Sequence, residues 1–199
     1  SASCAQLPVN DLSQWTLARR GEATVSQGAL DLRGKMALWS QQRFGDLDLT
    51  VRARMHSDGE IWLRFRYSND NTHYALALRG NNCNDLLLFR FSSGGEDRAL
   101  SVQPLGFTPR PEVTYQIRVV AKGAFLSVWV GDDPRPRLRV TDDRPLGPGL
   151  IGLGGGPFPA RFESVQVTGQ PTVSTGTEQE PSPEALRVNF QPMYYTLVD

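Results

Sequence analysis

The sequence predicts an all-β fold, a sandwich of two packed antiparallel sheets, and three observations carry that prediction. Apolar and polar residues alternate with a period of two from about Trp15 to Val167. Clusters of Gly, Asn, Asp and Pro, which favour turns, separate the alternating runs. The apolar positions favour Val and Leu, and the 199 residues include 19 Gly and 14 Pro, so very little helix is expected.

Each expected strand ends at a turn signal, such as Ser57-Asp58-Gly59, Gly80-Asn81-Asn82 or Lys122-Gly123. Their number suits two sheets. In chain order the expected strands are Trp15–Leu17, Thr24–Ser26, Ala29–Leu32, Met36–Ser40, Asp46–Met55, Glu60–Tyr67, His73–Arg79, Asp85–Phe91, Tyr115–Lys122, Phe125–Val130, Arg137–Val140, Leu150–Gly154 and Phe162–Thr168.

The composition divides the chain into three parts: a sandwich over 1–169, a flexible linker over 170–184 and a lone β-strand over 185–199. The lone strand is too short to fold alone. It either opens a further module or is donated to a sheet edge of the same or a neighbouring copy, and donation in trans would build filaments. Its expected apolar anchors are Leu186, Val188, Phe190, Tyr194 and Tyr195.

Charge and cysteine content narrow the possible partners. The chain has 21 Lys+Arg against 21 Asp+Glu and no basic stripe, which argues against a nucleic-acid partner. No apolar run approaches the length of a spanning helix, so no membrane insertion is expected. The two cysteines, Cys4 and Cys83, either form one disulfide in an exported protein or remain free.

The order of these signals resembles the concanavalin A-like jelly roll, in the bacterial branch that includes laminin G-like repeats, levan-binding carbohydrate-binding modules and 3-keto-disaccharide hydrolase domains. The resemblance covers about three quarters of the chain and implies a jelly-roll sandwich, without fixing a ligand. The segments that carry it are Asp11–Trp15, Gly28–Leu30, Phe44–Arg54, Ile61–Tyr67, Asn71–Tyr74, Tyr115–Val119, Gly149–Leu153 and Phe162–Val167.

Alternation along two strands predicts a carbohydrate-binding site. In Glu60–Tyr67, Ile61, Leu63, Phe65 and Tyr67 share the core face, and the remaining residues share the other. A Trp among charged groups suits a sugar, because the ring covers C–H faces while Arg and Glu bond hydroxyls. The strand Phe125–Val130 and its hairpin partner repeat this pattern. The predicted binding residues are Trp62, Arg64, Arg66, Arg118 and Trp129, with Glu60, Gln116 and His73 as second choices.

The alternative interpretation is that these outward side chains pack under a loop or against the C-terminal strand. The resemblance further implies a ligand on the concave sheet or at its loop edge. It also implies a structural calcium where the first and last strands meet, at Asp11 and Glu163, although the family usually has Asp in the closing strand. No other cofactor is expected.

No catalytic residue is predicted. The chain has no run of alternating carboxylates like that of the glucanases of this fold, no Gly-x-Ser-x-Gly elbow and only two histidines, His56 and His73. The main hypothesis is a non-catalytic extracellular or cell-surface module that binds a polysaccharide or glycan. A structural subunit that polymerises with copies of itself through the C-terminal strand is the alternative, and a sugar-active hydrolase is the minority interpretation.

Overall fold

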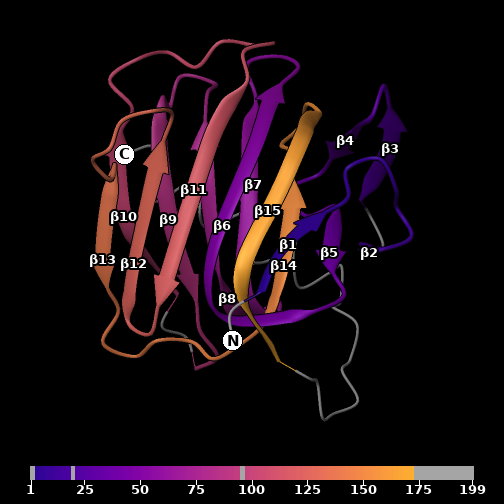
Figure 1. Cartoon of the computed structure of the whole chain (residues 1–199). Coiled ribbons are helices and arrows are strands. Elements are labelled where there is room, and N and C mark those ends of the chain that lie inside the picture. Colours follow the sequence, from indigo (N-terminus) through magenta and orange to yellow (C-terminus); the bar gives the residue numbers. More distant parts are fainter. Residues whose placement is uncertain (1–2, 19–20, 95–96, 173–199) are drawn as a thin grey trace.

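The computed structural model describes residues 3–18, 21–94 and 97–172. These residues form a sandwich of two antiparallel sheets (Figure 1). Among them no helix is long and apolar enough to cross a membrane. The predicted fold class is confirmed.

The eight-stranded sheet lies at the front in Figure 1. Its strands follow the order β13-β12-β11-β6-β15-β4-β3, and β1 pairs with β15 beside β4. Their bounds are β1 Ser3–Leu7, β3 Glu22–Ser26, β4 Ala29–Arg33, β6 Arg43–Met55, β11 Tyr115–Lys122, β12 Phe125–Val130, β13 Leu138–Thr141 and β15 Ala160–Thr172.

The seven-stranded sheet lies behind it, in the order β10-β9-β8-β7-β14-β5-β2. Its strands are β2 Trp15–Leu17, β5 Leu38–Ser40, β7 Glu60–Asn69, β8 Thr72–Arg79, β9 Asp85–Phe91, β10 Arg98–Pro104 and β14 Leu150–Gly154. The sequence did not predict β1 or β10. β10 is an exposed edge strand that ends in a proline, and its side chains give little apolar alternation.

The core fills the space between the sheets with the inward residues of each strand. Leu49, Val51, Val119 and Val165 come from the eight-stranded sheet and meet apolar side chains such as Leu76 of the other sheet. The outer faces of the two sheets therefore remain for other roles, and they differ sharply.

A β-bulge in β7 corrects the predicted alternation. Between Arg64 and Tyr67 the strand has one residue more than its partner β14 between Gly152 and Leu150, and Arg66 adopts a left-handed φ of 48°. The extra residue turns Arg66 out of the predicted row. Its guanidinium donates to the carbonyls of Gly45 and Gly123 and to Asp46, at the β6 start and the β11–β12 turn.

Tyr67 moves to the outer face for the same reason, because each residue beyond a bulge changes sides. There it packs with Ala18, Met36 and Trp39. The prediction that Tyr67 belongs to the core face and Arg66 to the binding face is therefore wrong.

Candidate functional site

The outer face of the seven-stranded sheet gathers charged and aromatic side chains, most of which are almost completely buried. Trp62 is 1% exposed and Arg64 is 0% exposed, although both point away from the core between the sheets. We call this group the outer-face cluster. Its members are Lys35, Glu60, Trp62, Arg64, Tyr67, Asp70, His73, Arg79, Asp85, Phe89 and Phe91.

Trp62 lies at the centre of the cluster, on β7. Its indole Nε1 donates to Oε2 of Glu60 at 2.6 Å. The Lys35 ammonium lies 5.3 Å from the ring centroid and the Arg64 guanidinium 5.4 Å from it. Burial, together with the positive charges of Arg64 and Arg79, lowers the Lys35 pKa to about 8, and Glu60 opposes the shift.

Arg64 and His73 join β7 to β8. Nη1 of Arg64 donates to Nε2 of His73 at 2.7 Å, and Nδ1–H of His73 donates to the carbonyl of Asn69 at 3.1 Å. An imidazole that accepts at one nitrogen and donates at the other is neutral. Burial, together with the charge of Arg64, lowers the His73 pKa well below its usual value.

Aromatic rings continue from His73 across β9 and along β7. The His73 ring stacks on Phe91 with centroids 4.4 Å apart, and Tyr67 lies 5.0 Å from it on the other side. The Tyr67 hydroxyl donates to Asp70. Burial raises the pKa of the Asp70 carboxyl, although its Tyr67 and Arg64 neighbours oppose the shift.

A buried ion pair closes the other end of the cluster. Arg79 of β8 faces Asp85 of β9, and its Nε and Nη2 each donate to a carboxylate oxygen at 2.7 Å. Bidentate geometry fixes both side chains. The cluster is thus a rigid strip with aromatic rings in its middle and charged hydrogen-bonding groups along its length.

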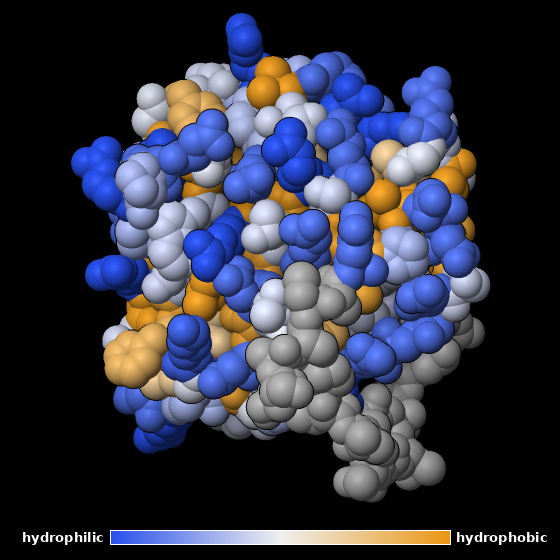
Figure 2. Space-filling view, in the orientation of Figure 1, coloured by the Kyte–Doolittle hydropathy of each residue, from blue (hydrophilic) through white to orange (hydrophobic). Residues whose placement is uncertain are grey.

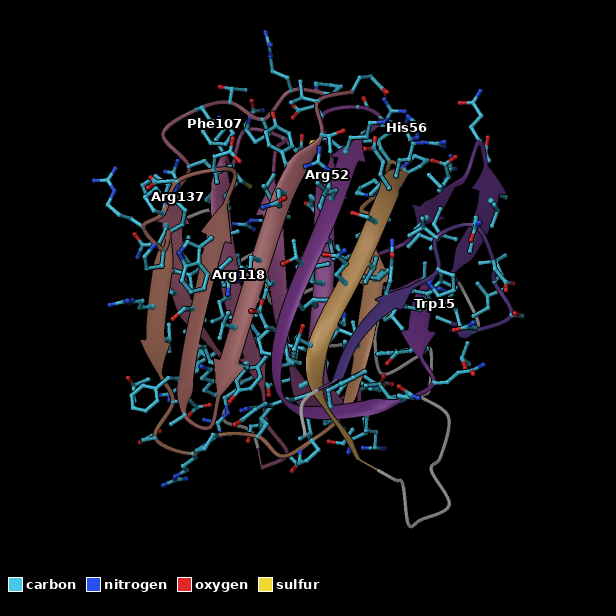
Figure 3. All side chains as sticks on the ribbon, viewed as in Figure 1. Trp15, Arg52, His56, Phe107, Arg118 and Arg137 are labelled. Carbon is cyan, nitrogen blue, oxygen red and sulfur yellow. The ribbon has the colours of Figure 1, made fainter. Side chains whose placement is uncertain are left out.

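The structure divides the predicted binding residues between the two sheets. Trp62, Arg64, Glu60 and His73 lie together in the outer-face cluster. Gln116 and Arg118 lie on β11, which pairs with β6, and Trp129 lies on β12, which pairs with β11. All three thus belong to the eight-stranded sheet, where Figure 3 shows Arg118. They therefore belong to a different surface from Trp62.

The outer face of the eight-stranded sheet is an ordinary solvated surface. Arg118 forms an exposed bidentate pair with Asp48 at 2.7 and 2.9 Å and lies 5.0 Å from the Trp129 ring centroid. The Trp129 indole donates to the Pro134 carbonyl. Figure 2, viewed onto this sheet, shows mainly hydrophilic residues with apolar residues between them.

Sequence reasoning missed Lys35, Tyr67, Asp70, Arg79, Asp85 and Phe91. Alternation from His73 leads to Arg79, and alternation back from Phe91 leads to Asp85, so the sequence contained that signal. Tyr67 was hidden by the bulge. Lys35 and Asp70 reach the cluster from turns, where no strand periodicity reports the direction of a side chain.

Asp11 and Glu163, the predicted calcium ligands, each interact with other side chains. Asp11 accepts hydrogen bonds from the backbone N–H and the hydroxyl of Ser13, which lower its pKa. Glu163 accepts from Thr114 and lies 3.4 Å from Arg54, whose positive charge opposes a metal. The described residues contain no group of three or more His, Cys, Asp or Glu side chains placed to hold a metal ion.

The predicted disulfide is not formed, because Cys83 carries a free thiol. Cys83 lies in the turn between β8 and β9, whereas the backbone of Cys4 pairs with Thr168 in the opposite sheet. Burial raises the pKa of the Cys83 thiol. The predicted assembly residues Leu186, Val188, Phe190, Tyr194 and Tyr195 lie outside the described residues.

Comparison with known proteins shows which solved structures have a similar fold. No protein-family model and no curated protein matches the chain. Carbohydrate-binding module CBM66 from Bacillus subtilis is similar in structure, with a TM-score of 0.58 and 17% identity over 80% of this chain and 94% of that one.

Two further solved structures are similar. The β-glucanase of Bacillus licheniformis gives a TM-score of 0.66 with 14% identity, over 84% of this chain and 98% of that one. The exoplasmic/lumenal domain of VIP36, bound to Ca²⁺ and Man3GlcNAc, gives 0.60 with 13% identity, over 86% and 90%. With its two antiparallel sheets in the order described above, the chain has the concanavalin A-like jelly-roll fold.

Proposed function

We propose that this chain is a non-catalytic carbohydrate-binding module that holds a polysaccharide on the outer-face cluster. The observation that carries the proposal is the environment of Arg64, fully buried among Trp62, His73 and Phe91 on the outer side of a sheet. Burying a cation costs free energy of desolvation, and a solvent-exposed sheet face with no binding role does not require a buried cation. The opposite sheet shows that alternative in its exposed pair Arg118–Asp48.

The chemistry of the cluster suits a sugar. A pyranose or furanose presents C–H groups on its faces and hydroxyls around its rim. Trp62 and Phe91 supply aromatic planes for the faces. Glu60, Arg64 and Lys35 supply charged acceptors and donors for the hydroxyls, and charge-assisted hydrogen bonds are the strong ones.

Lys35 gives a route to the ring. It is half-buried above Trp62, whereas Trp62 itself is almost completely buried. A lysine stem has several rotatable bonds, so its ammonium can swing aside while the sugar takes its place over the indole. Binding then exchanges a cation–π contact for a stacking contact.

The similar structures support the sugar class. One is a carbohydrate-binding module and another is a domain with a bound Man3GlcNAc. The cluster's carboxylates already serve other side chains: Glu60 accepts from Trp62, Asp70 from Tyr67 and Asp85 from Arg79. This arrangement favours binding over hydrolysis. An extracellular or cell-surface location fits a polysaccharide ligand and is part of the proposal.

Affinity electrophoresis of the full chain through a panel of neutral and acidic polysaccharides tests the proposal. We expect retardation by at least one polymer, and about tenfold weaker binding by Trp62→Phe, which removes the indole N–H and part of the ring area while keeping an aromatic core. Trp129→Phe is the matched control on the other sheet and should bind normally. Reducing-end release should be absent.

Two results would overturn the proposal. One is normal mobility of the wild-type chain in every polymer. The other is a loss of binding in Trp129→Phe with none in Trp62→Phe, which would move the ligand to the eight-stranded sheet. Circular dichroism of both variants shows whether either change has disturbed the fold.

A further inference from the structure

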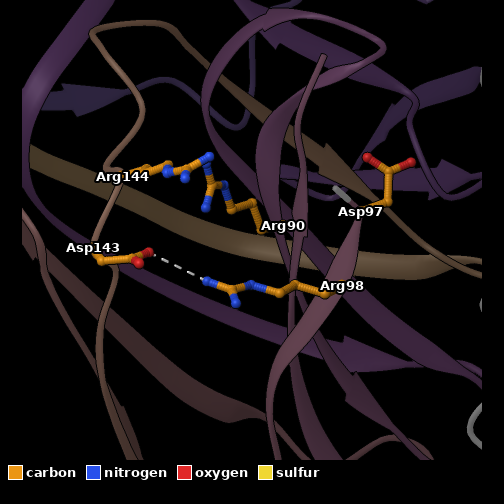
Figure 4. Close-up of a pocket in the computed structure, with 5 residues that line it drawn as sticks. All are labelled: Arg90, Asp97, Arg98, Asp143 and Arg144. Atoms are coloured by element: carbon orange, nitrogen blue, oxygen red, sulfur yellow. Dashed lines mark ion pairs between the residues drawn. The ribbon is translucent and has the colours of Figure 1, made fainter. Parts of the chain in front are cut away.

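A cavity of about 340 Å³ lies at one end of the sandwich, between the β10 start and the loop from β13 to β14 (Figure 4). The described residues that line it are all charged: Arg90, Asp97, Arg98, Asp143 and Arg144. Three guanidinium groups around one small cavity form a donor-rich site, because each carries five N–H groups in a planar fork.

Arg90 is the anchored member of this site. It is 4% exposed, and its Nη1 donates at 3.0 Å to Oδ1 of Asp142, which is 0% exposed. Asp142 also accepts from the hydroxyl of Tyr74 at 2.6 Å and from the backbone N–H of Arg144 at 3.0 Å. These bonds hold Arg90 in place and occupy Asp142.

The donors of Arg90 are not all satisfied. Its Nε is buried and has no hydrogen-bond partner among the residues that the structure describes. A buried N–H without an acceptor is costly. A further anion in the cavity would improve the electrostatic environment of this guanidinium.

Asp143 holds the place where such an anion could bind. Its Oδ1 lies 3.5 Å from Nη2 of Arg98, and both side chains are exposed, at 79% and 55%. An exposed pair of this kind contributes about 0–1 kcal/mol, so it exchanges readily. Asp97 is occupied otherwise, since it accepts from the backbone N–H of Ser92. With Asp142 included, the described residues at the cavity are three arginines and three aspartates, whose formal charges cancel. An anion therefore binds by displacing Asp143 rather than through excess positive charge.

The cavity lies at the same ends of β8 and β9 as His73 and Phe91, but on the inner side of the seven-stranded sheet. Arg90 precedes Phe91 and pairs with the core residue Tyr74, so its side chain points to the opposite face from Phe91. A polymer lying over His73 and Phe91 reaches the cavity by crossing these strand ends.

We propose that the arginine cavity binds the anionic substituent of an acidic glycan, either a uronate carboxylate or a sulfate ester, as a subsite across the strand ends from the outer-face cluster. The inference rests on the proposed function for the polymer itself. Both substituents are planar or tetrahedral oxyanions that accept two hydrogen bonds from one guanidinium. Arg98 would provide those bonds as Asp143 turns away.

Titration calorimetry with three polymers of similar length tests the subsite: polygalacturonate, dextran sulfate and unmodified dextran. We expect Arg98→Gln to weaken binding of an acidic polymer about tenfold and Asp143→Asn to strengthen it, because the competing carboxylate is gone. Arg139→Gln removes the same charge from β13 in the opposite sheet and is the control for non-specific attraction. The polymer that responds identifies carboxylate or sulfate as the substituent.

Three outcomes would overturn the subsite. Arg98→Gln and Arg139→Gln could weaken acidic polymers equally, Asp143→Asn could weaken them, or neither acidic polymer could bind better than dextran. Failure of the proposed function is recognised separately, since Trp62→Phe would then leave every polymer unaffected. If no polymer binds, the same variants titrated with galacturonate and inorganic sulfate by NMR decide whether the cavity takes an anion, and no perturbation would also overturn the subsite.

Discussion

Acidification should destabilise the protein through His73, one of its two histidines. The folded state holds this imidazole neutral, because Nε2 accepts from Arg64 and Nδ1–H donates to Asn69. Its folded pKa is therefore lowered, and the unfolded chain binds the proton first as the pH falls. The stability that His73 contributes is complete above the unfolded pKa of about 6.5 and is lost progressively below it.

The size of the effect follows from proton linkage. Each pH unit below the unfolded pKa costs about 1.4 kcal/mol while the folded imidazole stays neutral. Between pH 7 and pH 5 the loss is about 2 kcal/mol, since titration of the unfolded state is only partial near pH 6.5. Arg64 is the charged group that acts on the ring, and it remains in the variant used for comparison.

Urea unfolding of the wild type and of His73→Gln at pH 7 and pH 5 measures this loss. Glutamine can still accept from Arg64 and donate to Asn69, but it cannot be protonated. We expect the wild type to lose about 2 kcal/mol more than the variant on acidification. Equal losses would refute the neutral, doubly bonded imidazole.

Three further predictions concern groups elsewhere in the described structure. His56 lies between Asp31 and Glu112, 3.0 Å from each, at the end of the sandwich shown in Figure 3, and these carboxylates raise its pKa. The resulting stability is present below about pH 6.5 and is lost as the pH rises through the folded pKa; solvent exposure limits it to less than about 1 kcal/mol. His56→Gln should remove this contribution, and an unchanged pH dependence of urea unfolding in the variant would contradict the prediction. Asp142→Ala strands the buried Arg90 and should cost about 3–5 kcal/mol in guanidinium unfolding, or about 10 °C in Tm, whereas the exposed Asp132→Ala should cost little; similar values for the two would contradict the role of Asp142. After reductive ¹³C-methylation, NMR should show Lys35 titrating near pH 8, with the chain's other lysine, Lys122, as the reference signal, and a Lys35 midpoint near 10.4 would show that the amine is not desolvated.

Most of the fold could be predicted locally. A period of two along each strand indicates which residues face the core, and turn residues indicate where a strand ends. All thirteen strands expected between Trp15 and Thr168 therefore occur, five with the predicted bounds and eight with bounds that differ by a few residues. β10 was missed because an exposed edge strand such as Arg98–Pro104 needs no apolar face. Glu60, Trp62, Arg64 and His73 were predicted correctly to share a surface, because their strands are consecutive and pair as a hairpin.

Only the tertiary structure decided which strands share a sheet. Alternation fixes the side of a strand that faces the core, but it carries no information on which sheet the strand joins. The sequence alone therefore could not show that Arg118 and Trp129 lie on the opposite surface from Trp62.

The bulge at Arg66 is also a tertiary result. One extra residue against β14 exchanges the sides of Arg66 and Tyr67, and the sequence of β7 alone does not report its partner's register. The sequence by itself thus determined a two-sheet sandwich and half of the candidate site. Long-range pairing decided the rest, because contacts between distant strands depend on backbone hydrogen bonds that every residue type except proline can both donate and accept.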